Sequence, residues 1–134
     1  MRPIQKPMQN AQERQQQTQQ RLEAVFNTSY HSDMNNFATY LAYNGLDATR
    51  KLKTEVNIAR EEDKKQTELM YNKVKKLVSD SDYIEYEEYY EEESSKGVLW
   101  YAWKVNFLKD AKRLKTKYFG FIKINNKFYL GAVD

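Results

Sequence analysis

The C-terminal part of the chain alternates apolar and polar residues with the period of a β-strand, and this pattern constrains the fold most. The apolar residues of one parity in its first segment are Leu99, Tyr101, Trp103, Val105 and Phe107. Two further strand-like segments, 117–124 and 127–133, flank the pair Asn125-Asn126. Because asparagine tolerates positive φ, this pair predicts a two-residue hairpin turn. The region therefore favours antiparallel strands.

Residues 80–93 precede this region and interleave acidic residues with tyrosines. The residues of one parity include Ile84, Tyr86 and Tyr90. Such alternation suits an edge strand with one wet face. We expect a turn over residues 94–97, and a loop or a single helical turn over the basic segment 108–116. Together these segments predict a small antiparallel sheet of three or four strands.

Two helices are expected before the sheet. The first begins after Ser32, a good N-cap, and ends at Asn44-Gly45. Its apolar stripe comprises Met34, Phe37, Ala38, Leu41 and Ala42. The second runs from Asp47 to Val78, about 48 Å at 1.5 Å per residue, with neither glycine nor proline to stop it.

The expected long helix is apolar at both ends and polar in the middle. Asp63 and Gln66 occupy the positions of its apolar seam where a coiled coil would have aliphatic residues. Two readings remain open. It is either an ordinary core helix whose middle crosses solvent, or a helix that packs against a copy of itself or another protein.

The N-terminal residues 1–27 are rich in glutamine and poor in apolar side chains. We interpret them as an extended or helical arm that orders on a partner, or else as a disordered tail. The residues assigned to partner contact are Gln12, Gln15, Gln16, Gln19 and Leu22. The expected organisation is α+β, with this arm, a helical region at 28–79 and a β region at 80–134, the last two forming one folded unit.

Charge is strongly segregated along the β region. Residues 80–95 hold eight acids and no base, whereas residues 96–134 hold nine bases and two acids. Opposite charges on adjacent strands attract, so we expect the acidic segment to neutralise part of the basic one.

Catalysis is not expected of this chain. It has no cysteine, one histidine (His31) at a helix start, and four glycines too scattered to form a phosphate-binding loop. The acidic segment lacks the central glycine of a calcium loop. We therefore predict a protein without enzymatic activity, metal or cofactor.

The basic segment suggests binding of nucleic acid, because cations neutralise phosphates and rings stack on bases. The candidate residues are Trp100, Trp103, Lys109, Lys112, Arg113, Lys115 and Lys117. The acidic segment suggests instead a small phage-encoded inhibitor that mimics nucleic acid. Its candidate residues are Glu85, Tyr86, Glu87, Glu88 and Tyr90.

The leading hypothesis is a structural or interaction protein whose arm lies on neighbouring subunits of an assembly. The frequent use of lysine, asparagine and tyrosine resembles that of proteins from low-GC bacteria and their phages. One such assembly is a phage particle, of which this chain would be a minor component. Other protein subunits are the main expected partners, nucleic acid is an alternative, and the long helix allows a homo-oligomer. No stretch approaches the roughly 20 apolar residues of a membrane span, so we expect a cytoplasmic or virion protein and no membrane partner.

Overall fold

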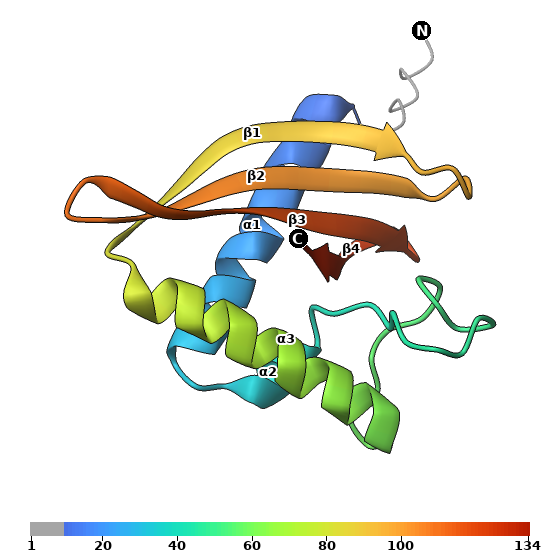
Figure 1. The fold of residues 1–134 in the computed structure, drawn as a ribbon. Helices are drawn as coiled ribbons and strands as arrows, with labels where there is room; N and C mark the ends of the chain where they lie inside the picture. The colour runs from blue at the N-terminus through green and yellow to red at the C-terminus, as the bar shows by residue number, and fades with distance from the viewer. Residues whose placement is uncertain (1–9) are drawn as a thin grey trace, which may run out of the picture.

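A computed structural model describes residues 10–134, which form three helices and one antiparallel sheet of four strands (Figure 1). The elements are α1 (Ala11–Tyr30), α2 (Met34–Ala38), α3 (Glu61–Asp80), β1 (Tyr83–Glu93), β2 (Leu99–Lys109), β3 (Lys112–Ile124) and β4 (Lys127–Val133). The strands lie in sequence order, each antiparallel to the next. The α+β fold class, with a short helix, a long helix and a small antiparallel sheet, is confirmed.

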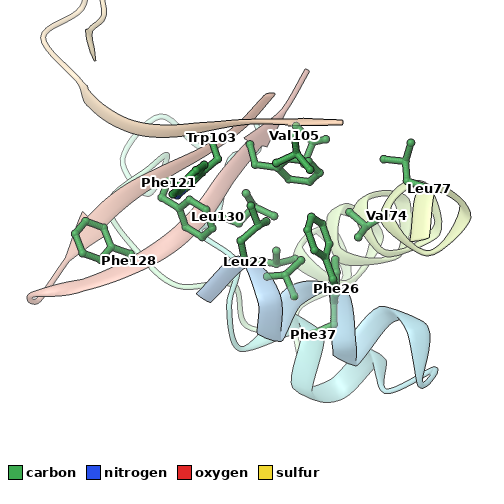
Figure 2. Close-up of a cluster of buried hydrophobic side chains, with 14 of the residues drawn as sticks. Leu22, Phe26, Phe37, Val74, Leu77, Trp103, Val105, Phe121, Phe128 and Leu130 are labelled. Carbon is green, nitrogen blue, oxygen red and sulfur yellow. The ribbon is translucent and has the colours of Figure 1, made fainter. Parts of the chain in front are cut away.

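One face of the sheet carries the core, and the helices pack against it (Figure 2). The alternation predicted for β2 is confirmed, because Tyr101, Trp103, Val105 and Phe107 are all buried on this face. Leu99, of the same parity, lies at the start of the strand and is exposed. The period-2 pattern therefore identified the side of the strand that meets the helices.

Two tight turns set the register of β2, β3 and β4. Asn125 and Asn126 have φ of 50° and 65°, which confirms the predicted hairpin between β3 and β4. Asp110 and Ala111 have φ of 52° and 63° and make a second such turn. The prediction of a loop or helical turn at 108–116 was wrong, because the strands continue to within one residue of this turn on either side.

A bulge at Glu87 changes which tyrosines of β1 face the core. The pairing with β2 shifts between Tyr86 and Glu88, so one extra residue lies in β1. Tyr89 therefore joins Tyr86 on the helix side. Tyr90, predicted to share that parity, lies on the opposite face beside Tyr118.

The glutamine-rich segment is an integral helix of the fold over the residues that the structure describes. The buried residues of α1 follow one helical stripe: Thr18, Leu22, Val25, Phe26 and Ser29. Arg14 forms an ion pair with Glu91 of β1, at 2.6 Å between Nε and Oε2. A free arm over 1–27 is not confirmed, because residues 11–27 pack as part of α1; residues 1–9 lie outside the described part.

Thr18 also accepts a hydrogen bond that joins α1 to the centre of the sheet. Trp103 Nε1–H donates to Thr18 Oγ1 at 2.9 Å, and both residues are buried. The hydroxyl itself donates to the carbonyl oxygens one turn back in its own helix. Polar side chains on an otherwise apolar stripe thus give α1 a specific position against β2.

We expect Thr18→Val to lower the free energy of unfolding by about 2 kcal/mol, because it leaves the buried indole N–H without an acceptor. Thr28→Val is the matched control, since Thr28 Oγ1 bonds only to carbonyls of its own helix. The control should change stability by no more than about 0.5 kcal/mol. Urea unfolding of both variants checks this, and equal losses would contradict a role for the indole bond.

The long helix is shorter than predicted: α3 begins at Glu61, not at Asp47. Residues 43–60 form a loop in which Leu52 has a φ of 60°, a conformation that no α-helix contains. The polar seam positions explain the loop. Gln66 binds it through its side-chain amide, accepting from Asn44 N at 3.0 Å and donating to Ala42 O at 2.9 Å.

Asp63, the other polar seam position, is fully buried and forms a two-bond ion pair with Arg50. Its Oδ2 also accepts from Asn57 N at 2.8 Å. The Arg50 guanidinium lies 4.0 Å from the centre of the Tyr43 ring. The hydrogen bonds from Arg50 hold the pKa of Asp63 below its ordinary value. The two polar residues in the apolar seam, Asp63 and Gln66, therefore mark the part of α3 that binds the preceding loop.

Asp63→Asn should lower the free energy of unfolding by about 3 kcal/mol at pH 7, because it leaves the Arg50 charge without its partner. Because the pKa of Asp63 is lower in the folded chain than in the unfolded chain, its ionised carboxylate stabilises the native state at pH values above the unfolded pKa of about 4. That contribution disappears as the pH falls below about 4. The variant should consequently lose less stability than wild type between pH 5 and pH 3, a window centred on the ordinary aspartate pKa of about 4.

Denaturant titrations at several pH values measure both effects. Asp80→Asn is the control, since Asp80 forms an exposed pair with Lys76 and should contribute no more than about 0.5 kcal/mol. An equal pH profile for wild type and Asp63→Asn would contradict this account of the loop.

Candidate nucleic-acid interface

The β2–β3 turn projects beyond the helices at the left end of the sheet in Figure 1. We call its cations the basic hairpin: Lys109, Lys112, Arg113, Lys115 and Lys117. Four of them are exposed and Lys117 is half-buried. None forms an ion pair with another residue of the described range 10–134. The structure thus brings together all five basic residues that the sequence indicated.

A groove of about 440 Å³ separates this hairpin from the C-terminal half of α3, and we call it the basic groove. Its lining residues are Lys73, Lys76, Leu77, Asp80, Phe107, Leu114, Lys115 and Lys117. Lys115 pairs with Phe107 and Lys117 with Val105 across the strands, so both lysines point to the helix side. Cations from two elements therefore border one apolar floor.

Carboxylates at this end of the sheet are fewer than the cations and are engaged. Asp80 Oδ2 lies 2.9 Å from Lys76 Nζ, one turn back in α3. Asp82 Oδ2 accepts a hydrogen bond from Asp110 N at 3.0 Å and so binds β1 to the turn. Lys73, Lys76 and the basic hairpin supply seven cations against the three carboxylates of Asp80, Asp82 and Asp110, so the surface has an excess of positive charge.

The two tryptophans do not belong to this interface. Trp103 is buried beneath α1 and donates its indole N–H to Thr18. Trp100 lies on the opposite face of the sheet. The prediction that they stack on bases beside the lysines was wrong, because β2 buries Trp103 near its centre and places Trp100 at the end of the strand away from the basic hairpin. The floor aromatic, Phe107, is only 1% exposed.

The acidic strand forms an ion pair and side-chain hydrogen bonds with β2, near the centre of the sheet. Lys104 Nζ lies 2.7 Å from Glu87 Oε2. Asn106 Nδ2 donates to Glu85 at 2.6 Å and to Glu87 at 2.7 Å. The hydrogen bond from Lys104, followed by that from Asn106, lowers the pKa of Glu87. The expected attraction between neighbouring strands is confirmed here, and through the charge of Glu87 it reaches Arg113 of the basic hairpin without an ion pair.

Four of the five residues proposed for an inhibitor lie on the open face of β1, and only Tyr86 does not. Glu85 and Glu87 bind their neighbours in β2, and Tyr86 faces the core, where burial raises its pKa. Glu88 is exposed, and Tyr90 lines a separate pocket. Glu85, Glu87, Glu88 and Tyr90 thus share the face of β1 opposite the core, and their contact with a basic protein stays a prediction.

The partner-binding residues assigned to the arm lie on α1. Leu22 is fully buried in the core, so its assignment to a partner was wrong. Gln12, Gln15 and Gln16 are exposed and Gln19 is half-buried. Contact of these glutamines with neighbouring subunits stays a prediction.

Two absences hold for residues 10–134. None of their helices is long and apolar enough to cross a membrane. Over the same range, no three histidine, cysteine, aspartate or glutamate side chains come together as metal ligands.

Sequence reasoning missed Lys73, Lys76 and Leu114. The two lysines lie three residues apart on α3 and flank the buried Leu77, a spacing that places them at the edge of the packed face. Leu114 occupies a bulge between Lys115 and Arg113, where the pairing with β2 shifts. That bulge had no signal in the sequence.

The chain matches no known family, no curated protein and no solved structure in comparisons of sequence and fold.

Proposed function

We propose that this is a non-enzymatic protein that binds nucleic acid through the phosphate backbone. The observation that supports the proposal best is the basic hairpin, five cations on a projecting turn without ion-pair partners in the described range. Lysine and arginine on an accessible surface neutralise phosphates and release counterions, which gives affinity independent of base sequence.

The basic groove extends the hairpin surface toward α3. Lys73 and Lys76 stand across the groove from Lys115 and Lys117, so a phosphate chain that follows the groove meets cations on both sides. Its floor of Leu77 and Leu114 offers neither hydrogen-bond donors nor acceptors to read base edges. The geometry supports contact with the backbone, and the floor of the groove provides no group for direct base readout.

Fluorescence anisotropy with a labelled duplex of mixed sequence and about 20 base pairs tests the hairpin. The triple variant Lys112→Glu, Arg113→Glu, Lys115→Glu should bind at least about tenfold more weakly. Its dependence of log K on log salt concentration should be shallower by about 3, one for each lost phosphate contact.

The matched control changes net charge equally at three exposed lysines far from the hairpin: Lys51→Glu, Lys53→Glu and Lys64→Glu. It should keep most of the affinity and of the salt slope. Equal weakening by both triples would show that only net charge matters, and unchanged binding by the hairpin triple would exclude this surface.

Single-stranded DNA of the same length gives a second test. Because the only ring in the groove lining, Phe107, is 1% exposed, and the exposed Tyr83 lies opposite Leu108 on the other face of the sheet, base stacking adds nothing in the groove, and the single strand should bind no more tightly than the duplex. Tighter binding of an oligothymidine would contradict an interface made of backbone contacts alone.

A further inference from the structure

A second hollow lies on the face of the sheet opposite the core, and we call it the open-face pocket. It measures about 210 Å³. Its lining residues are Tyr90, Glu92, Trp100, Ala102, Tyr118, Gly120, Ala132 and Asp134. These come from β1, β2 and β3 and from β4 with the residue that follows it. The basic hairpin contributes no residue to this pocket.

Small residues in one row across the sheet create the hollow. Tyr90 pairs with Ala102, Ala102 with Gly120, and Gly120 with Ala132. A Cβ atom on Gly120 would lie 2.8 Å from the Trp100 ring, so the indole rests on bare backbone. Replacing this glycine would displace the ring.

Three aromatic rings wall the pocket. The Tyr90 and Tyr118 rings are 6.5 Å apart between centroids and inclined at 71°. Trp100 packs at its back against the small cluster of Ile122, Tyr129 and Ala42, which holds its ring in place. Tyr118 is 40% exposed. The rings are thus held by packing and remain accessible from solvent.

Two carboxylates complete the rim. Glu92 stands opposite Trp100 in the β1–β2 register, and Asp134 exchanges two backbone hydrogen bonds of 2.9 Å with Tyr118. Within residues 10–134, neither carboxylate forms an ion pair. Burial first, and then the charge of Glu92, raise the pKa of Tyr90. The pocket therefore combines π faces with negative charge.

No cation on the pocket lining neutralises the negative charge of Glu92 and Asp134. Lys104, opposite Tyr118 in the β2–β3 register, is bound to Glu87 at 2.7 Å and is adjacent to Glu88 in the β1–β2 register. Lys51, Lys53 and Lys96 line a separate pocket that shares Trp100. No lining residue is basic. A ligand that enters the pocket must supply the positive charge.

We infer that the open-face pocket binds an arginine side chain of a partner protein. A planar guanidinium stacks on an indole or phenol face and gains cation–π attraction. Its N–H groups donate to Glu92 and Asp134, which a quaternary ammonium, having no N–H, cannot do.

Nuclear magnetic resonance of the full chain tests this inference, because the protein has two tryptophans in contrasting environments. The peptide acetyl-Gly-Arg-Gly-amide should shift the indole N–H signal of Trp100 saturably. The signal of Trp103, buried and bonded to Thr18, should not move and serves as an internal control. The same peptide with neutral citrulline in place of arginine should bind at least about tenfold more weakly.

Glu92→Gln with Asp134→Asn should weaken the arginine peptide at least about tenfold. Glu61→Gln with Asp110→Asn is the matched control, with the same charge change at exposed positions outside the pocket, and should bind as wild type does. Equal binding of the citrulline peptide, tighter binding of a trimethyl-lysine peptide, or full binding by the Glu92/Asp134 variant would each overturn the inference. None of these outcomes depends on whether the basic hairpin binds nucleic acid.

Discussion

The packing of α1 against the sheet is the contact on which the rest of the structure depends. Phe26 meets Phe119 and Phe107 edge to face, with ring centroids 5.3 and 5.7 Å apart. Each ring is almost completely buried, and such pairs add to the hydrophobic gain of burial. Without α1, the apolar face of a sheet of this length would be open to water, and α3 alone is too narrow to cover it. The basic groove and the open-face pocket both depend on a sheet whose apolar face is covered by α1.

Three polar contacts fix the angle at which α1 crosses the strands. Arg14 binds Glu91 of β1, Thr18 accepts from Trp103 of β2, and Arg21 Nε donates to the Phe128 carbonyl of β4 at 2.8 Å. Apolar burial is non-directional, whereas each of these bonds accepts only a narrow geometry. The glutamines between them fill the solvent side, which is why the segment reads as polar although its helix is part of the core.

Sequence patterns over a few residues predicted the features that depend on backbone preference and side-chain periodicity alone. The Asn125-Asn126 turn and the core parity of β2 follow from backbone preference and periodicity. The short helix exists where expected, but Asp33 and not Ser32 caps it, and it ends at Ala38 instead of Asn44-Gly45. The β1 bulge at Glu87 and the turn at Ala111 were missed, because pairing with a neighbouring strand decides them. The α3 boundary was missed because Asp63 is stabilised by Arg50, thirteen residues earlier, and only the folded loop brings the two together.

The candidate interface was predictable to the same extent. Five of its cations lie within nine residues of one hairpin, so a charge count finds them. The lysines of α3 enter only because the chain returns across the sheet, which spacing along the sequence does not encode. The aromatic residues misled because a ring near lysines in the sequence serves a core as well as a ligand. Here β2 buries Trp103 under α1 and places Trp100 on the opposite face of the sheet.

The sheet itself keeps the two charge classes of this chain apart. Acidic residues of β1 and basic residues of β2 and β3 are neighbours in the strand order, and where they meet, at Lys104 and Glu87, they pair. The bulge beside that pair sends Tyr90 to the open face, next to Glu92 and Asp134, while the hairpin turn takes the remaining cations beyond the end of β1. Pairing at the centre thus leaves an acidic aromatic pocket at one end of the sheet and a basic hairpin at the other. A short helix-backed sheet can in this way present two surfaces of opposite sign, one suited to an anionic polymer and one to a cationic side chain.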